Sequence, residues 1–178
     1  MLYSIRKSTL EDIPDLLRLA EAARGIMRSS GNHGQWVGGY PSADVFKADI
    51  ERGCSYLLTD VKGQAAGTFA FIPSPEPTYA AIYDDALPGG ELIHGAWLDD
   101  GPYYVVHRIA SLPECHGVMR ALLDFCFSHT CNLRIDTHRD NRIMQHLLER
   151  YGFTRCGIIY LSNGDERLAY QKHLALTS

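Results

Sequence analysis

Residues 103–124 constrain the fold more than any other part of this chain. Residues 103–110 are largely β-branched and aromatic and carry apolar groups on both alternating faces, which is typical of a strand buried on two sides. The strand pattern ends at Pro113, which lacks a hydrogen-bond donor, and after Gly117 the apolar spacing becomes helical. This stretch therefore predicts a central strand, a turn and a helix.

A helix that begins in such a turn is suited to bind a phosphate or pyrophosphate. Its first backbone N–H groups have no partners within the helix, and the positive end of the helix dipole lies beside them. An ordinary connection between a strand and a helix has the same pattern, so the turn alone leaves both interpretations open.

Size and charge exclude several classes of protein. A chain of 178 residues fits a single domain, residues 1–178, which can bury roughly two thirds of its extended surface. The net charge is −4 and the basic residues are scattered, which is unlike a nucleic-acid binder. The N-terminus has no export signal, and no apolar stretch is long enough to cross a bilayer. We therefore expect a cytoplasmic protein with neither a nucleic-acid nor a membrane partner.

The cysteines are interpreted as reduced thiols. There are five, an odd number without CxxC spacing. A zinc site is the alternative, with the candidate ligands Cys115, His116, Cys126, His129 and Cys131. A predicted helix separates these residues, whereas zinc ligands usually come in close pairs, so we expect no metal.

The first half of the chain predicts a strand, two helices and a hairpin. Residues 2–7 alternate as a strand, and a capping box follows before an amphipathic helix, formed either by Ser8 with Glu11 or by Thr9 with Asp12. The other elements expected here are a helix at 43–52, capped by Ser42, and hairpin strands at 55–60 and 64–72.

A glycine-rich segment, residues 29–42, separates the two helices. Its glycines prevent a stable helix or strand, while Trp36 and Tyr40 supply large apolar side chains on a mobile backbone. Such loops often close over ligands. The same two rings could equally well plug the edge of the core.

The second half contains a long connection and then alternating strands and helices. Residues 73–101 are unusually many for a connection, so we expect structure within it: a short helix beginning at Pro77 and an extended piece at 91–98. The later elements expected are a strand at 133–137, a helix at 141–150 capped by Asp140, and hairpin strands at 153–161 and 166–172.

Four segments together resemble a known family. They are VHRIASLPE at 106–114 followed by Gly117, RALLDF at 120–125, LRIDTHRDN at 133–141 and LLERYGF at 147–153. This combination resembles the GNAT superfamily of acyl-CoA-dependent N-acyltransferases. The resemblance implies an α/β fold (α+β mixed sheet). In it, helices flank one twisted mixed β-sheet and form a three-layer sandwich with it. The expected element order, βααββ, insertion, βαβαββ, matches that architecture.

The resemblance also implies how acetyl-CoA is held. In that family the backbone amides of the turn hold the coenzyme pyrophosphate, in the pattern Gln or Arg, two residues, Gly, one residue, Gly or Ala. Gly117 falls on the first Gly, while Met119 and Glu114 stand where a small residue and a Gln or Arg are usual. We expect Glu114 to face solvent, Arg120 to reach a phosphate, and backbone N–H groups near Ile109 to polarise the acyl carbonyl. The implied coenzyme contacts are Arg108, Ile109, Ala110, His116, Gly117, Val118, Met119, Arg120 and Asn141.

Acyl transfer to an amine needs a base. His107 and His138 are the candidates because imidazole titrates near the operating pH, and Asp136, two residues before His138 on the same strand face, could orient that ring. His107 could instead be a satisfied core residue. Asp136 could instead pair with Arg134 or Arg139 and be structural.

The general acid is less well matched. In the family it is commonly a Tyr four residues before the Gly of the Gly-Phe pair, and that position is Leu148 here. Tyr151, three residues further on, could serve instead or could pack as a core ring against Phe153. Asn141 has two interpretations as well, a coenzyme contact or a neighbour of the helix cap.

We therefore predict an N-acetyltransferase that moves an acetyl group from acetyl-CoA, its cosubstrate, to the amine of a small molecule or amino-acid-like acceptor. In the family the segment between the first two helices borders the acceptor, so the resemblance implies substrate contacts by Asn32, Gln35, Trp36 and Tyr40. The alternative is a non-catalytic acyl-CoA-binding or sensing domain of the same fold, which the degenerate turn and the vacant tyrosine position favour. Whether the chain forms a homodimer is left open.

Overall fold

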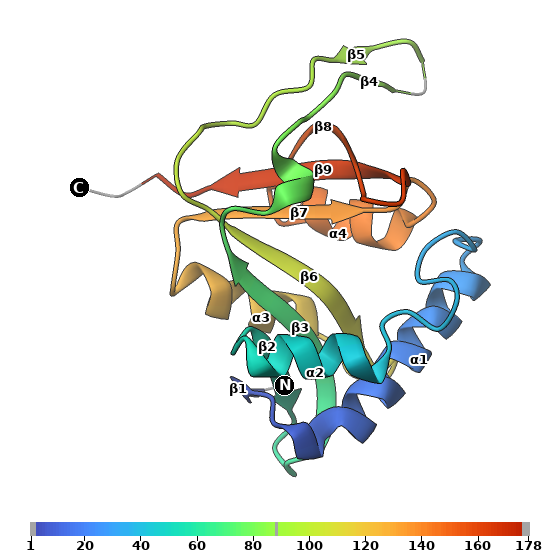
Figure 1. Cartoon of the computed structure of the whole chain (residues 1–178), viewed down its shortest axis with the longest axis vertical. Coiled ribbons are helices and arrows are strands. Elements are labelled where there is room, and N and C mark those ends of the chain that lie inside the picture. The colour runs from blue at the N-terminus through green and yellow to red at the C-terminus, as the bar shows by residue number, and fades with distance from the viewer. Residues whose placement is uncertain (1–2, 88, 176–178) are drawn as a thin grey trace. The chain divides into compact units, whose positions relative to one another are not determined.

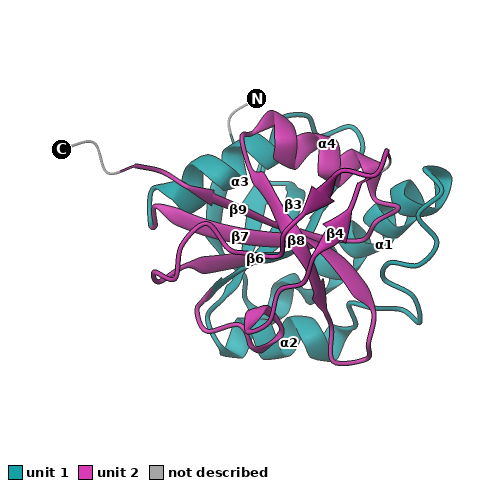
Figure 2. Ribbon diagram, turned by 90° about the horizontal axis from the view of Figure 1, so that it is seen from above, with its two compact units in different colours: residues 1–72, 106–129 teal, residues 73–105, 130–178 magenta. Residues whose placement is uncertain are grey.

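A computed structural model describes residues 3–87 and 89–175 of the chain (Figure 1). The chain divides into two compact units, which Figure 2 shows in different colours. Unit 1 comprises Met1–Ile72 and Val106–His129, and unit 2 comprises Pro73–Val105 and Thr130–Ser178. Within the described ranges, no helix has the length and apolarity needed to cross a membrane.

One mixed β-sheet runs through the fold. Its seven strands are hydrogen-bonded in the order β1-β2-β3-β6-β7-β9-β8. Strand β6 (Tyr104–Ser111) belongs to both units, because Tyr104 and Val105 lie in unit 2 and the rest lies in unit 1. It is parallel to β7, with Tyr104 opposite Leu133, whereas β1–β2, β2–β3, β7–β9 and β8–β9 are antiparallel. The predicted α/β class, with helices flanking one mixed sheet, is confirmed.

Unit 1 contains the N-terminal elements and the helix that follows β6. Its elements are β1 (Ser4–Lys7), the 3₁₀ turn η1 (Leu10–Asp12), α1 (Ile13–Ser29), α2 (Ala43–Glu51), β2 (Ser55–Thr59), β3 (Ala65–Pro73) and α3 (Val118–Phe127). The strands and helices expected in this part of the sequence are confirmed, although the strand expected at 2–7 begins at Ser4 and residue 2 lies outside the described residues. Of the two expected capping boxes, the second forms, since the Thr9 amide donates to Asp12 Oδ2 over 2.7 Å.

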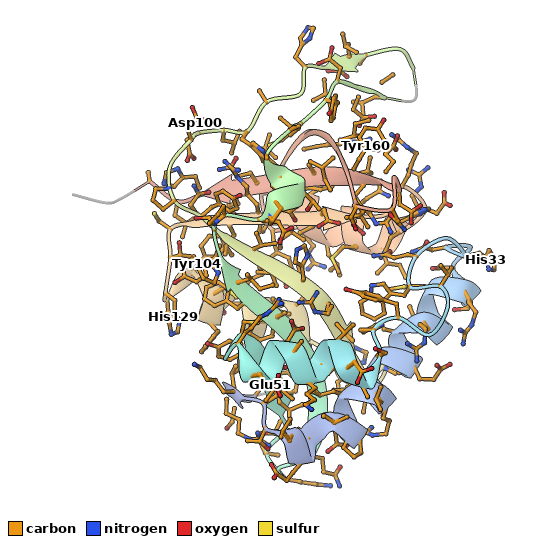
Figure 3. The ribbon with its side chains drawn as sticks, viewed as in Figure 1. His33, Glu51, Asp100, Tyr104, His129 and Tyr160 are labelled. Carbon is orange, nitrogen blue, oxygen red and sulfur yellow. The ribbon has the colours of Figure 1, made fainter. Side chains whose placement is uncertain are left out.

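The core of unit 1 joins α1 and α2 to the strands and holds α3. Its buried cluster is Leu16, Leu19, Ala20, Ala23, Met27, Phe46, Leu57, Ala65 and Ala110. The Phe125 ring of α3 lies 5.2 Å from that of Tyr56 and 4.4 Å from that of His129, which Figure 3 labels. Gly67 on β3 lets the start of α3 approach, because a Cβ there would lie 2.6 Å from Val118 Cγ1. The start of α3 is therefore fixed against the strands.

Unit 2 contains the long connection and the C-terminal elements. These are the 3₁₀ turn η2 (Pro77–Tyr79), β4 (Asp85–Ala86), β5 (Leu92–Ile93), the start of β6, β7 (Asn132–Thr137), α4 (Arg142–Arg150), β8 (Thr154–Tyr160) and β9 (Glu166–His173). The buried cluster of unit 2 is formed by Tyr79, Val105, Ile159 and Ala169. The predicted strand at 133–137 and the closing hairpin are confirmed.

The connection is less regular than the sequence predicts. The helix expected to begin at Pro77 is a single 3₁₀ turn, because the chain then leaves the helical path and Tyr83 pairs with Ile158 of β8. The extended piece expected at 91–98 is a strand only at β5, where it pairs with β4. Pairing with distant strands thus overrides the local helix signal.

Helix α4 also begins one residue later than predicted. Asn141, not Asp140, is its N-cap: Asn141 Oδ1 accepts the Met144 amide over 3.1 Å. The Asp140 amide instead donates to His138 Nδ1 over 3.1 Å. Asp140 therefore belongs to the turn before the cap.

Candidate active site

Helix α3 begins at an open glycine. Gly117, its N-cap, has a φ of 82°, in the left-handed region that favours glycine, and a Cβ built on it would meet nothing within 4 Å. A glycine cap has no side chain to accept the first N–H groups of the helix, so these groups have no side-chain cap at the positive end of the dipole. Such a helix start can bind a pyrophosphate. Arg120, in the first turn, is exposed and lies 3.7 Å from Asp124.

The side chains around this turn leave the opening clear. Met119, at the position where the resemblance predicts Gly or Ala, is buried in the core together with Val118. Glu114 is exposed, as predicted. His116 is exposed too, and its carbonyl oxygen accepts the Tyr3 hydroxyl over 2.8 Å. The two departures from the family pattern therefore do not fill the space in front of the amides.

Strand β6 carries an irregular residue, Arg108, whose φ is 54°. This conformation costs a non-glycine residue roughly 1–2 kcal/mol. The guanidinium is firmly held: Nη2 donates to Asp49 Oδ1 over 2.8 Å, Nε lies 2.6 Å from Asp49 Oδ2, and Nη1 donates to the Tyr40 hydroxyl oxygen over 3.2 Å. Burial alone would lower the pKa of Arg108, but Tyr40 and Asp49 outweigh it and raise that pKa. Since the Arg108 side chain already binds Asp49 and Tyr40, Arg108 can contact the coenzyme only through its backbone. The contacts expected at Ile109 and Ala110 are also backbone contacts.

The four residues predicted to face the acceptor lie together in unit 1. Asn32 is buried, and its Nδ2 donates to Gln35 Oε1 over 2.8 Å. The Trp36 ring stands edge-on to the Tyr40 ring, with centroids 6.3 Å apart, and packs against the core cluster of unit 1. Tyr40 is 39% exposed, and its carbonyl oxygen accepts from Arg24 Nη1 over 2.9 Å. Trp36 thus matches the core-edge interpretation, whereas Tyr40 is open to a ligand.

Asp136 of β7 is paired with a tyrosine for which the sequence carries no signal. The Tyr79 hydroxyl donates to Asp136 Oδ1 over 2.7 Å, across 57 positions of the chain. Burial, together with the charge of Asp136, raises the pKa of Tyr79 well above its usual value, so the phenol stays protonated. Of the two alternative partners, Arg134 stacks on two aromatic rings and Arg139 pairs with two other carboxylates.

His138, directly after β7, has a defined tautomer when neutral. Its Nδ1 accepts the Asp140 amide, so Nε2 carries the proton of the neutral ring. Burial lowers the pKa of His138 below its usual value, and the positive charge of Arg167 adds to this effect, against the opposing carboxylate of Asp140. At neutral pH the ring therefore offers an N–H donor rather than a lone pair. His107, half-buried on β6, is the other candidate base.

The position that the resemblance assigns to the general acid holds no phenol. Leu148 stands there and is fully buried. Tyr151, at the end of α4, is half-buried, and its carbonyl oxygen accepts from Lys172 Nζ over 2.6 Å. Asn141 is buried and caps α4, which supports its structural interpretation.

The cysteines and histidines considered for zinc are not gathered. Among the residues that the structure describes, no set of three or more His, Cys, Asp or Glu side chains is placed to hold a metal ion. Burial raises the pKa of the Cys126 thiol to about 12. A thiol that stays protonated is a poor metal ligand, so Cys126 is a core residue.

Comparison with known proteins identifies both the fold and the family. No protein-family model and no curated protein matches the sequence. Among solved structures, a GNAT-family acetyltransferase from Streptococcus agalactiae is 31% identical, with a TM-score of 0.82 over 97% of this chain and 95% of that one. A GNAT-family acetyltransferase from Listeria monocytogenes is 20% identical, with a TM-score of 0.65 over 97% of this chain and 95% of that one. The ribosomal-protein-S18-alanine N-acetyltransferase from Escherichia coli is 18% identical, with a TM-score of 0.59 over 99% and 97%.

The mixed sheet and the helix that begins at Gly117 fit an acyltransferase of the kind that uses acyl-CoA. With 31% identity over 97% of its length to a GNAT-family enzyme, the chain belongs to the GNAT family of acetyltransferases. The two more distant structures share its fold. The predicted family is confirmed, and with it acetyl transfer as the class of reaction and acetyl-CoA as the family's cosubstrate.

Proposed function

We propose that this enzyme acetylates the amine of a small molecule or an amino-acid-like acceptor. The observation that carries the proposal is the link between the glycine-rich loop and β6, in which Arg108 donates to the Tyr40 hydroxyl. In the family the pantetheine arm lies along this strand like an added strand. The link therefore brings the loop beside Ile109, where the thioester is expected.

The loop has groups that suit a small amine. The Tyr40 hydroxyl is held in place by Arg108 at a partly exposed position. Within the described part of the chain, the buried Oδ1 of Asn32 has no hydrogen-bond donor. A buried amide oxygen in this state gains from an N–H donor such as an amine.

Main-chain groups would hold the coenzyme. The N–H groups that follow Gly117 bind the pyrophosphate, and Arg120 contributes a charge-assisted bond to a phosphate. Backbone N–H groups at Ile109 and Ala110 polarise the acyl carbonyl. None of the main-chain contacts depends on side-chain identity, which explains how the turn functions with Met119 in place of a small residue.

We assign proton removal from the attacking amine to His107. The amine nitrogen forms a bond to the acetyl carbon, the C–S bond of the thioester breaks, and the proton released by the amine passes to His107 and then to the departing thiolate. His138 presents an Nε2–H donor when it is neutral, so it is not assigned as the base.

Release of the CoA thiol across a panel of small amines tests this proposal. The wild-type enzyme should release thiol with at least one amine. Tyr40→Phe should raise the KM of that amine by about 2- to 10-fold, the range of one lost hydrogen bond, and leave the KM of acetyl-CoA unchanged. Tyr160→Phe, at a similarly exposed tyrosine of β8 labelled in Figure 3, is the matched control.

Two outcomes would count against the proposal. Equal increases in the KM of the amine and of acetyl-CoA would remove the loop from the acceptor site. Binding of acetyl-CoA without thiol release for any amine would favour the alternative, an acyl-CoA-binding domain without catalysis.

A further inference from the structure

Three side chains of unit 2 form a line of polar contacts apart from the residues assigned above. Cys131 Sγ lies 3.5 Å from His173 Nε2, and His173 Nδ1 lies 2.7 Å from Asp99 Oδ2. Cys131 precedes β7, His173 ends β9, and Asp99 lies in the loop that leads to β6, next to Asp100, which Figure 3 labels. The Cys131 thiol therefore contacts the His173 imidazole, which in turn contacts the Asp99 carboxylate.

Asp99 is held as a fixed, ionised acceptor. Its Oδ1 accepts the Gly101 amide and Asn132 Nδ2, both over 2.9 Å, and its Oδ2 accepts Gln171 Nε2 over 3.1 Å. Burial alone would raise the pKa of Asp99, but the bonds from Gly101, His173 and Asn132 outweigh it and hold that pKa below its usual value. Because an ionised carboxylate only accepts, His173 Nδ1 carries a proton and donates it to Asp99.

This tautomer directs the other ring nitrogen at the thiol. With the proton on Nδ1, neutral His173 presents the lone pair of Nε2 to Cys131, whose S–H can donate to it. Transfer of this proton yields a thiolate beside an imidazolium that Asp99 stabilises, which is how cysteine nucleophiles are activated. The site is open to solvent, since the His173 side chain is 40% exposed and Cys131 is half-buried.

The other four cysteines are held as thiols. Burial raises the pKa of each, to about 12 for Cys126 and about 11 for Cys156. Cys54 is buried as well, whereas Cys115 is half-buried, and neighbouring carboxylates raise its pKa further. Cys115 is thus a matched control for Cys131, with comparable access, but the carboxylates of Glu114 and Asp60 outweigh Arg18 among its charged neighbours.

We propose that Cys131 is a nucleophilic thiol that undergoes exchange with low-molecular-weight disulfides. Cys131 passes its proton to His173 Nε2, and the thiolate attacks one sulfur of the disulfide and forms a new S–S bond. The old S–S bond breaks, and the departing thiolate takes the proton back from His173. The Cys131 sulfur is oxidised and the departing sulfur is reduced, so the step needs no other reagent.

A disulfide fits this site better than a thioester does. Exchange requires a thiolate, a proton donor for the leaving group and access from solvent, and the Cys131 site supplies all three. Acyl transfer from acetyl-CoA would require hydrogen-bond donors for an oxyanion in addition. Acetyl-CoA is therefore the competing electrophile to be tested beside the disulfide.

The rate of reaction with dithiodipyridine, followed by the absorbance of the released thiopyridone, tests the proposal on the folded protein. Cys115→Ser leaves Cys131 as the accessible thiol, and Cys131→Ser leaves Cys115. An ordinary thiol is only about 3% ionised at pH 7, so complete proton transfer allows a rate gain of up to about 30-fold, which the weaker nucleophilicity of a stabilised thiolate reduces. We expect Cys131 to react roughly tenfold faster than Cys115.

A histidine variant separates activation from mere exposure. His173→Gln keeps the length of the side chain but removes the base, so it should lower the rate at Cys131 to that at Cys115 and move its pH dependence to higher pH. Oxidised glutathione should form a mixed disulfide with wild-type Cys131, located by peptide mass spectrometry and reversed by a reductant. Melting curves confirm that each variant is folded.

The proposal is overturned if Cys131 and Cys115 react at equal rates in the two serine variants, a comparison that leaves His173 intact. An unchanged rate at Cys131 in folded His173→Gln would overturn it as well. Acetylation of Cys131 by acetyl-CoA, without a mixed disulfide from glutathione, would refute the assignment to disulfides.

Discussion

Removal of the Asp49 carboxylate should reveal how much the ion pair between Asp49 and Arg108 contributes to the stability of the fold. The Asp49 and Arg108 side chains are 5% and 13% exposed, and two contacts of 2.8 and 2.6 Å join them. Loss of one partner of such a pair costs about 3–5 kcal/mol, because the other charge stays buried without compensation. Alanine regains up to about 0.7 kcal/mol of helix propensity in α2. We therefore expect Asp49→Ala to lower the free energy of unfolding by about 2–4 kcal/mol.

Thermal and urea unfolding measure this loss. For a chain of 178 residues each kcal/mol moves Tm by about 2–4 °C, so Tm should fall by roughly 4–16 °C. Glu51→Ala, on the same helix and labelled in Figure 3, is the control. The Lys47–Glu51 pair is exposed with a separation of 3.9 Å, so its loss should change stability by less than about 0.5 kcal/mol.

The double variant Asp49→Leu with Arg108→Met removes both charges at once. Replacement of a buried ion pair by apolar side chains is often neutral, so stability should return to within about 1 kcal/mol of wild type. The hydrogen bond from Arg108 to the Tyr40 hydroxyl is lost in this variant, so the KM of the amine should be higher than in the wild type although the stability is restored. An Asp49→Ala protein as stable as Glu51→Ala would refute the reasoning, because the pair would then be solvated. A double variant as unstable as Asp49→Ala would place the loss in the packing of α2.

Three further predictions concern the candidate site. Gly117→Glu should greatly weaken coenzyme binding in a calorimetric titration, because the added charge opposes the pyrophosphate. Gly117→Ala has the same backbone strain of about 1–2 kcal/mol but no charge, so it should bind the coenzyme nearly as wild type does, and equal affinity of the two variants would remove the turn from the site. Acetyl-CoA at about 100 times its Kd should stabilise the protein by about 2.7 kcal/mol and raise Tm by roughly 5–10 °C. Dephospho-CoA should retain most of this shift, and no shift with either compound would contradict the assigned pyrophosphate site. The pKa of His138 is lower in the folded protein than in the unfolded protein, where it is about 6.5, so the unfolded chain binds more protons and stability should fall as pH drops below about 6.5. His138→Gln should reduce this fall in urea unfolding measured between about pH 7 and pH 5. An unchanged dependence of stability on pH would count against a buried neutral ring.

The elements that could be predicted from the sequence are those with local signals. The two-sided apolar pattern of β6 and the glycine that opens α3 depend only on neighbouring residues, and both lie where they were expected. The predictions failed at two places, one where two local options compete and one where a distant strand overrides a local signal. Asp140 and Asn141 are both good helix caps, and the helix signal at Pro77 yields to the pairing of Tyr83 with β8.

The turn that we propose to hold the coenzyme could be predicted from the sequence because backbone N–H groups need only a glycine at the right place. The loop that we propose to border the acceptor could be predicted from its glycines and aromatic rings. Which of its rings is open could not be predicted, because the burial of Trp36 and the exposure of Tyr40 depend on a core assembled from several elements.

Three of the side-chain links described above join residues far apart in the sequence, so tertiary structure alone decided them. Arg108 and Asp49 are 59 positions apart, Tyr79 and Asp136 are 57 apart, and His173 and Asp99 are 74 apart. With 21 acidic and 17 basic residues in the chain, spacing cannot choose among so many possible pairs. By itself the sequence determined most strands and helices and the glycine N-cap at Gly117, because those follow from contacts between neighbours. The contact between Cys131 and His173 exists because β7 pairs with β9, which places His173 opposite Asn132, the neighbour of Cys131, and strands so far apart in the sequence meet only in the folded sheet.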